Sequence, residues 1–418
     1  MDRRQPVVGM LAIGTVIAVA LSFIPYFLIP RATGEPSLAA ASVSAPALES
    51  VAPKRARGEP VFDAASWYAA RGEEPETHGV LIETLDQERV LASHNADQAF
   101  NPASLIKLAT SLAVLRRFGA DFRFQTQVFM DGSVDQTGAL QGRLYVTGAD
   151  PTFGDYGANL IAKELRERGI KRITDAVIVS PDFCFNFSGS AEESAARLLR
   201  ALRVKSPKTG LATEPAGERL FTLNSNPLRD ILLYMNAHSS NFVAERLGEL
   251  IGGPSGLQQF LINQLGLPMS QVSIETTSGR QHNRMTPRGL LAVIRALVDE
   301  AKEQGLEPAD IMPIASDDSG TLRRRLAGTG LEGAVVAKTG TLTADIDGGM
   351  ASLAGIVYTQ DAGPIIFSIL DQGPRIWENR QLEDQLLAEV INMQSTPRAI
   401  ASPAPRRMLP SSNLSIDE

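Results

Sequence analysis

The chain has 418 residues, of which 44% are hydrophobic and 21% charged, so it can bury a core and is not a largely disordered chain. Its 40 Lys and Arg residues against 47 Asp and Glu residues give a net charge of −7, which argues against a nucleic-acid-binding protein. The single cysteine, Cys184, excludes an internal disulfide and a cysteine-based zinc site. Because it lies between two phenylalanines, we expect a buried structural thiol.

Residues 1–30 differ from the rest of the chain. Two arginines precede a charge-free run over residues 6–30, and Val7–Ile24 alone would span about 27 Å as a helix, close to the thickness of a bilayer core. The positive charge before this run places the N-terminus in the cytoplasm and the remainder outside. We expect residues 7–29 to be an uncleaved anchor in the cytoplasmic membrane. A cleaved signal peptide is the alternative, and both predict a periplasmic or extracytoplasmic location in the cell envelope.

Composition divides the rest of the chain into a linker, a folded part and a tail. Residues 31–62 are rich in Ala, Ser, Pro and Gly, which predicts a linker. Residues 396–418 combine prolines with serines, which predicts a disordered tail. Between them we expect a domain in two parts, residues 63–121 and 221–395, with an accessory domain inserted at 122–220.

The predicted elements form a hairpin, then helices, then a run of three strands and a final helix, with a strand-rich insertion. Apolar alternation predicts a β-hairpin over 79–92, and helical spacing predicts a helix over 104–118. The insertion is predicted to have strands at 124–129, 142–147 and 176–179 and one helix near 160–168. The later predictions are helices at 229–251, 256–265 and 287–304, strands at 333–342, 349–358 and 364–370, and a helix at 379–393. This order predicts an α/β (α+β) fold in which both chain ends build one sheet with helices packed on it.

Ser104-Leu105-Ile106-Lys107 lies at the start of the predicted helix 104–118. Residues three apart on a helix share a face, so the Lys107 amine can reach the Ser104 hydroxyl. A serine becomes a good nucleophile when a neighbouring base takes its proton, and a neutral lysine can do this. The pattern alone is weak evidence, because Ser-x-x-Lys occurs about once or twice by chance in a chain of this length and an N-cap serine explains it equally well.

Two further motifs follow along the chain. Ser239-Ser240-Asn241 precedes a helical segment, and Lys338-Thr339-Gly340-Thr341 lies on a predicted strand. Ser-x-Asn is also common by chance, whereas Lys-Thr-Gly is expected on the order of 0.1 times per chain. Glycine lets a ligand backbone approach the strand, and the lysine and threonine supply donors for a carboxylate.

In this order the three motifs form the set shared by penicillin-binding proteins and serine β-lactamases. Over roughly residues 63–393 the sequence resembles the class C low-molecular-mass penicillin-binding proteins, the D-alanyl-D-alanine carboxypeptidase/endopeptidase family (peptidase family S13). The resemblance extends to four other segments of the chain: Phe100–Ser104, Gly148–Thr152, Asn283–Pro287 and Ser319–Arg323.

The chain departs from the family pattern at three places. Ser240 stands where the family usually has Asp. Thr277–Arg280 replaces the more usual Asp-Gly-Ser-Gly-Leu, which puts the substrate contacts of that loop in doubt. The interval from Lys107 to Ser239 is short for the family, so we expect one accessory domain rather than two.

The resemblance implies a transpeptidase-like fold, with an antiparallel sheet flanked by helices and a strand-rich insertion. It also implies a serine-type D-Ala-D-Ala carboxypeptidase and/or endopeptidase that acts on peptidoglycan stem peptides and is acylated by β-lactam antibiotics. Such an enzyme needs no metal or cofactor. Within the resemblance, Asp150 could contact a stem-peptide amine, although an Asp-Pro turn explains it as well.

The resemblance also implies a role for each motif residue. Ser104 would attack the peptide bond, with Lys107 as base, and burial beside Lys338 would lower the pKa of Lys107 through desolvation and like charge. Ser239 would relay a proton, and Asn241 would hold both the substrate amide and Lys107. Further roles are assigned to the strand motif: Lys338 and Thr339 would bind the terminal carboxylate, Gly340 would line the substrate site, and the N–H groups of Ser104 and Thr341 would form the oxyanion hole.

Two alternative functions stay open from the sequence. A serine β-lactamase shares the acylation residues, but the long insertion and the Gly-Ala-Asp-Pro segment argue against it. A non-catalytic peptidoglycan-binding protein with the same fold is the other alternative, and the intact motif residues argue against that.

Overall fold

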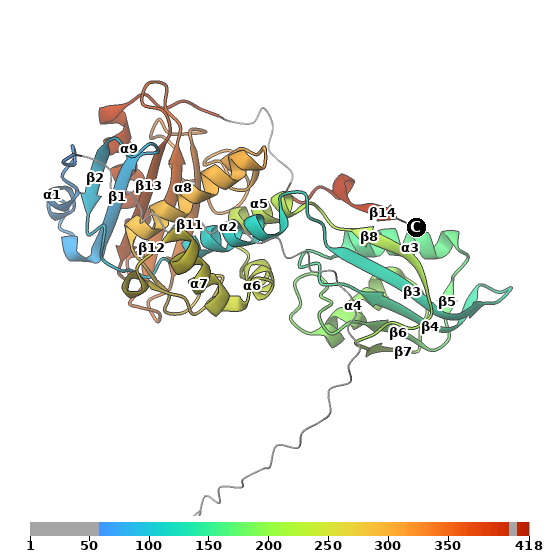
Figure 1. Cartoon of the computed structure of the whole chain (residues 1–418). Helices are drawn as coiled ribbons and strands as arrows, with labels where there is room; N and C mark the ends of the chain where they lie inside the picture. Colours follow the sequence, from blue (N-terminus) through green and yellow to red (C-terminus); the bar gives the residue numbers. More distant parts are fainter. Residues whose placement is uncertain (1–57, 401–407, 418) are drawn as a thin grey trace, which may run out of the picture. The chain divides into compact units, whose positions relative to one another are not determined.

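The computed structural model describes residues 58–400 and 408–417 (Figure 1). The predicted membrane segment at 7–29 and most of the predicted linker at 31–62 lie outside the described residues. Within the described ranges, no helix combines the length and the apolar character needed to cross a membrane.

A five-stranded antiparallel sheet forms what we call the main domain, and its strands come from both parts of the chain, as predicted. The strand order is β11-β12-β13-β1-β2, so the N-terminal hairpin pairs with the C-terminal strands. In the register, Ile82 lies opposite Phe367 and Lys338 opposite Ala354. The strands are β1 (His78–Thr84), β2 (Val90–His94), β11 (Val335–Leu342), β12 (Met350–Val357) and β13 (Ile365–Gln372).

Both faces of this sheet are covered by helices, which is possible because successive side chains of a strand point to opposite faces. On β13, Ile366 and Leu370 pack in one core with α2 and α8, whereas Phe367 and Ile369 pack in a second core with α9 (Figure 1). The helices of the main domain are α1 (Ala64–Ala69), α2 (Ile106–Phe118), α5 (Leu228–His238), α6 (Asn241–Glu249), α7 (Gly253–Leu265), α8 (Pro287–Glu303) and α9 (Ile376–Gln394).

Short elements complete the main domain. Strands β9 (Val272–Ser273) and β10 (Arg284–Met285) form a two-stranded sheet. Single 3₁₀ turns lie at Pro75–Thr77, Ala103–Leu105, Met269–Gln271 and Pro308–Asp310. The second of these turns replaces the first residues of the helix predicted over 104–118.

The insertion forms a second sheet with its own core, which we call the accessory domain. Strands β4, β6 and β7 pair in parallel, and helices α3 and α4 make the crossovers that parallel pairing requires. The sequence predicted one helix here and missed α4, whose buried residues include Ala195, Leu198 and Leu202. The elements are β3 (Gln125–Val134), β4 (Ala139–Thr147), α3 (Asp155–Glu167), β5 (Arg172–Ile173), β6 (Ala176–Val179), α4 (Ala191–Leu202), β7 (Lys208–Leu211) and β8 (Glu218–Asn224).

The prediction of a disordered tail is wrong for residues 408–417. A 3₁₀ turn at Ser411–Asn413 leads into β14 (Ser415–Asp417), which pairs antiparallel with β8. Ile416 packs against the accessory core, and Asn224 Nδ2 donates a hydrogen bond of 2.6 Å to Asp417 Oδ2. The open edge of β8 thus orders a segment whose own composition favours disorder.

Candidate active site

The first motif places its two functional groups in direct contact. Ser104 lies in the 3₁₀ turn before α2, Lys107 lies in the first turn of α2, and Lys107 Nζ is 2.9 Å from Ser104 Oγ. Lys107 Nζ also donates to Asn241 Oδ1 at 2.7 Å and to the Ser278 carbonyl. The amine is therefore held in place by three oxygens, one of which belongs to the candidate nucleophile.

Burial makes Lys107 unusual. It has 0% exposure and lies in a helix whose residues Ile106–Leu115 are all buried. Burial lowers the pKa of Lys107 to about 7, with Arg280 acting in the same direction and the carboxylate of Glu245 acting against it. The predicted like-charge repulsion between Lys107 and Lys338 contributes to the lowered pKa of Lys338, and Arg280 is a further cation that lowers the pKa of Lys107. A substantial fraction of Lys107 is therefore neutral near pH 7, as a base must be.

Ser239 and Lys338 form a second hydroxyl–amine pair. Lys338 Nζ donates to Ser239 Oγ at 2.9 Å and to the Thr339 carbonyl at 2.6 Å. Lys338 has 0% exposure, and its burial, followed by the charge of Lys107, holds its pKa well below the ordinary lysine value. The structure thus brings all three motifs together around two buried lysines.

The Ser239-Ser240-Asn241 motif lies where the helix predicted over 229–251 breaks into α5 and α6. Ser239 ends α5 in a left-handed conformation (φ 52°), and Ser240 caps α6 by accepting a hydrogen bond of 3.3 Å from Val243 N–H. The residue that stands in place of the family's Asp is therefore the N-cap of α6, a position that Ser and Asp fill equally well.

The Lys-Thr-Gly-Thr motif lies on β11, the edge strand of the main sheet. Ala337 N–H points away from β12, because it donates to the Pro313 carbonyl. Backbone groups alternate in direction along a strand, so the N–H groups of Thr339 and Thr341 face the same open edge. Thr339 Oγ1 donates to Thr321 Oγ1 at 2.8 Å.

Gly340 is required by a contact within the chain. A Cβ at this position would lie 2.1 Å from Ser352 Oγ, 2.9 Å from Ala103 Cβ and 3.0 Å from the Pro102 carbonyl oxygen. From the sequence, we expected this glycine to let a ligand backbone approach the strand. In the structure, it is the turn before Ser104 that packs closely against it.

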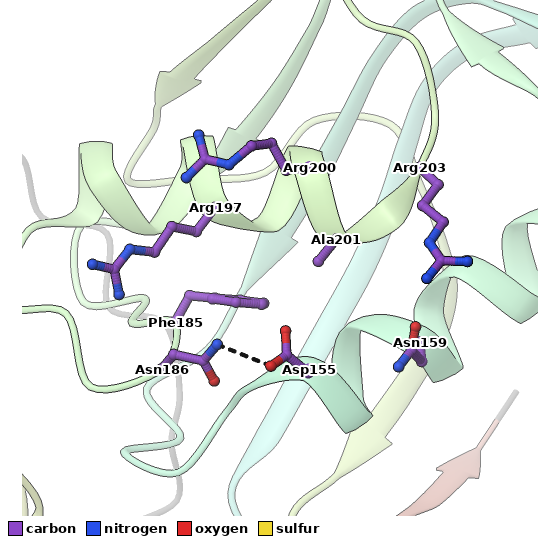
Figure 2. A pocket seen from close by; sticks show the side chains of 8 residues that line it. All are labelled: Asp155, Asn159, Phe185, Asn186, Arg197, Arg200, Ala201 and Arg203. Carbon is purple, nitrogen blue, oxygen red and sulfur yellow. Dashed lines mark hydrogen bonds between the residues drawn. The ribbon is translucent and has the colours of Figure 1, made fainter.

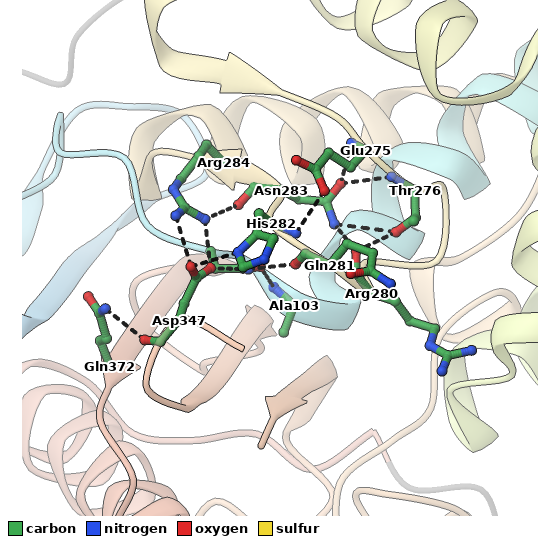
Figure 3. A network of polar contacts seen from close by, with 11 residues as sticks. Ala103, Glu275, Thr276, Arg280, Gln281, His282, Asn283, Arg284, Asp347 and Gln372 are labelled. Carbon is green, nitrogen blue, oxygen red and sulfur yellow. Dashed lines mark hydrogen bonds and ion pairs between the residues drawn. The ribbon is translucent and has the colours of Figure 1, made fainter. Parts of the chain in front are cut away.

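Asp347, on the loop between β11 and β12, joins three segments of the candidate site (Figure 3). Its carboxylate accepts hydrogen bonds from Asn101 Nδ2 (2.6 Å) and from Arg284 (2.7 and 3.0 Å), and it lies 2.9 Å from His282 Nδ1. The Arg284 guanidinium holds the pKa of Asp347 well below its usual value. Because Asn101 Oδ1 in turn accepts from Ala103 N–H at 3.0 Å, this network fixes the turn in which the first motif begins.

Several residues that contact the motif residues were not predicted from the sequence. The Thr277–Arg280 segment was noted only as a departure from the family, yet its Ser278 carbonyl binds Lys107 and its Thr277 hydroxyl donates to Glu245 Oε2 at 2.8 Å. No sequence signal marks a backbone carbonyl as a ligand. Asp347 could have been suspected only as an acidic residue a few positions after Lys-Thr-Gly.

Asp150 and Cys184 form a structural pair in the accessory domain. Asp150 Oδ1 accepts from Thr152 N–H (2.8 Å) and from its hydroxyl (2.7 Å), which is the turn geometry that the sequence analysis offered as an alternative to substrate contact. Cys184 is 2% exposed, which confirms the predicted buried thiol, and burial followed by the Asp150 charge raises its pKa to about 12.

This chain is similar to known proteins, to one of them over a short segment and to two others over most of its length. A segment of 94 residues is 29% identical to the D-alanyl-D-alanine carboxypeptidase of Actinomadura sp. (strain R39), a match that spans 22% of this chain and only 17% of that relative. The penicillin G-acylated endopeptidase Bd3459 of Bdellovibrio bacteriovorus has a similar fold (TM-score 0.68, 20% identity, 81% of this chain and 98% of that one). Penicillin-binding protein 4 of Haemophilus influenzae, complexed with a β-lactam, is also similar (TM-score 0.59, 20% identity, 74% and 96%).

The fold is therefore the mixed α/β fold of these proteins, as predicted. The family model of the D-Ala-D-Ala carboxypeptidase 3 (S13) family matches residues 65–186 and 186–391, a range that includes all three motifs. The chain belongs to the D-Ala-D-Ala carboxypeptidase 3 (S13) family.

Proposed function

We propose that this chain is a serine-type D-Ala-D-Ala carboxypeptidase or endopeptidase that cleaves peptidoglycan stem peptides through an acyl-enzyme. The observation that carries this proposal is the 2.9 Å contact between Ser104 Oγ and Lys107 Nζ, in a site where the lysine is fully buried. Membership of the S13 family supports it, as does the similarity to an endopeptidase that penicillin G acylates.

Acylation uses the first motif. The neutral Lys107 amine takes the proton of Ser104 while Ser104 Oγ forms a bond to the carbonyl carbon, and the carbonyl π electrons move to its oxygen. The N–H groups of Ser104 and Thr341 donate to this oxyanion, and Thr341 N–H faces the open edge of β11, where a substrate can lie. The C–N bond then breaks, and the proton that Lys107 took passes through Ser239, which Lys338 contacts, to the leaving amine, so that Lys107 is neutral again.

The remaining motif residues hold the substrate. Asn241 Oδ1 accepts from Lys107, which leaves Asn241 Nδ2 to donate to a substrate carbonyl. Lys338 and Thr339 bind the terminal carboxylate, and Gly340 lets the strand lie close to the nucleophile turn. Water then attacks the ester, with Lys107 as base again, and releases the shortened peptide and free Ser104.

Labelled penicillin tests the nucleophile. Wild-type protein should gain one covalent label per chain, and Ser104→Ala should gain none while it keeps its fold, because the variant lacks only one oxygen. Ser111→Ala is the matched control. It removes a buried hydroxyl of α2, seven residues after Ser104, whose Oγ donates to the Lys107 carbonyl at 2.7 Å, and this variant should still be labelled. Persistent labelling of Ser104→Ala would place the nucleophile elsewhere.

We also propose that residues 7–29 anchor the protein in the cytoplasmic membrane, with the bulk of the chain in the periplasmic or extracytoplasmic space. The charge-free run over residues 6–30, with positive charge before it, supports this. Full-length protein should stay with washed membranes and be open to external protease. Soluble protein of reduced mass, with a new N-terminus near residue 42, would instead show a cleaved signal peptide.

A further inference from the structure

A cavity of about 550 Å³ opens beside the Lys-Thr-Gly strand. It is lined by Thr339 of β11, by the segment that contains Thr321, and by the first turns of α9, including Trp377 and Arg380. Its volume lies in the range of about 300–1,000 Å³ that small-molecule sites occupy. Because Ser104 and Lys107 do not line it, the cavity extends from the proposed carboxylate-binding residue, away from the nucleophile.

The charges around this cavity are mostly positive. Arg325 is compensated, since it donates to Asp384 at 2.7–3.0 Å and to Glu383 at 2.7 Å. Arg323 and Arg324 also line the cavity, are exposed, and form no ion pair with an acidic group in the described part of the chain. The cavity therefore carries cations that no carboxylate of the described chain neutralises.

Arg380 connects this cavity to the strand motif. Its Nη2 donates to Thr341 Oγ1 at 2.6 Å, and its guanidinium lies 5.1 Å from the centre of the Trp377 ring. Arg380 Nε is buried and has no acceptor among residues 58–400 and 408–417. Burial and the charge of Arg325 lower the pKa of Arg380. An anion close to Arg380 would therefore offset the free-energy cost of keeping its charged guanidinium partly buried.

The proposed function identifies what would enter this cavity. Lys338 and Thr339 bind the carboxylate next to the scissile bond, and a leaving D-alanine has no second anionic group. The second stem peptide of a cross-link, by contrast, carries further carboxylates beyond that point. Only a leaving group of this kind gives the uncompensated arginines a partner.

We propose that this arginine-lined cavity is a leaving-group subsite that binds a second carboxylate, so that the enzyme prefers an anionic peptide leaving group, such as the second stem of a cross-link, over a lone D-alanine. The proposal rests on the proposed function and deepens it. It identifies Arg324 and Arg380 as specificity-determining residues, with Arg380 between the two carboxylate sites.

Another arginine-lined hollow, of about 590 Å³, lies in the accessory domain and provides a control (Figure 2). It is lined by Arg197, Arg200 and Arg203 together with Asp155. Arg197 is paired with Glu193 at 2.6 Å. Because this hollow contains none of the motif residues, Arg200→Gln removes one exposed charge without changing the proposed subsite.

The test compares two synthetic peptides with the same acyl half, one ending in D-Ala–D-Glu and the other in D-Ala–D-Gln. They differ only in the second carboxylate of the leaving group. We expect the wild-type kcat/KM to be about tenfold higher for the D-Glu peptide, the size of one charge-assisted hydrogen bond. Arg324→Gln and Arg380→Gln should bring this ratio towards one, and Arg200→Gln should keep it. The ratio should also fall with added salt, because Arg324 is exposed.

The remaining outcomes distinguish failure of the proposed subsite from failure of the proposed function. Equal cleavage of both peptides by the wild type, or a ratio that both arginine variants retain, would overturn the subsite and leave the proposed function standing. Failure to cleave either peptide, with no penicillin label on Ser104, would overturn the proposed function itself. If Arg380→Gln fails to fold, the exposed Arg324→Gln still decides the question.

Discussion

Lys107 illustrates how a single residue is adapted by its surroundings. A fully buried lysine in an apolar helix destabilises the fold unless its amine is satisfied, and here Ser104, Asn241 and the Ser278 carbonyl satisfy it. The same burial brings the pKa of Lys107 to about 7. Stability and reactivity therefore depend on the same contacts.

The pH dependence of acylation should follow this pKa. Since the neutral amine is the base, kcat/KM should rise with pH through about 7. The Arg280 cation disfavours protonated Lys107, so Arg280→Gln should move this acid limb to higher pH, with a severalfold loss below pH 7 and little change at pH 9. Glu245 acts in the opposite direction, so Glu245→Gln should move the limb to lower pH.

Acylation rates with a chromogenic β-lactam across pH 5 to 9 would measure both shifts. An acid limb that stays in place in both variants would show that Lys107 is not the group that titrates.

At the scale of elements, the site depends on the close approach of β11 to the turn before α2. Gly340, Ser352 and the Pro102 carbonyl meet there, and Ser352 Oγ donates to that carbonyl at 3.1 Å. The two motifs are more than 230 residues apart in the chain, so this packing is what sets the distance between the nucleophile and the strand. The Asp347 network also holds this turn, through Asn101 and Ala103 (Figure 3).

Gly340→Ala should therefore separate these two elements. The added Cβ would meet three groups at 2.1–3.0 Å, and overpacking of this kind costs about 1–3 kcal/mol. We expect at least a tenfold slower acylation by penicillin together with a lower Tm. Gly189→Ala is the control: its Cβ would meet nothing within 4 Å, and both quantities should stay near the wild-type values. Normal acylation by Gly340→Ala would show that the close packing of β11 against the turn before α2 does not control acylation.

At the scale of the whole molecule, the described residues divide their apolar side chains among separate cores. Two lie on the faces of the main sheet, and the third lies in the accessory domain. Strand β14 belongs to the third, because it pairs with β8 and Ile416 packs there, whereas Leu409 packs against a core of the main domain. Damage to the accessory core should therefore spare the chemistry of Ser104.

Deletion of residues 414–418, which removes β14 and leaves Leu409 and Asn413 in place, tests this division. Without β14, the edge of β8 loses its backbone partners, so those amides of Thr222–Asn224 that face β14 and not β3 should exchange with solvent at least about tenfold faster. Penicillin acylation should stay at the wild-type rate. The smaller change Ile416→Ala should give a smaller increase in exchange. Unchanged exchange in the deletion variant would show that the tail adds no stability.

The sequence alone determined the features that depend on short spacing. Ser104 and Lys107 are one helical turn apart, so their contact follows from local geometry, and the three strands between 333 and 370 follow from their apolar pattern. The resemblance to the S13 family rested on motifs of this local kind.

Only the tertiary structure decided which distant residues meet. Asn241 contacts Lys107 across 134 positions of the chain, and Asn101 contacts Asp347 across 246. Such contacts depend on how cores pack and loops close, and no local pattern encodes them. The order of the tail also lay beyond the sequence, because residues 415–417 pair with the edge of β8 and Leu409 packs against a core of the main domain, contacts that composition does not predict.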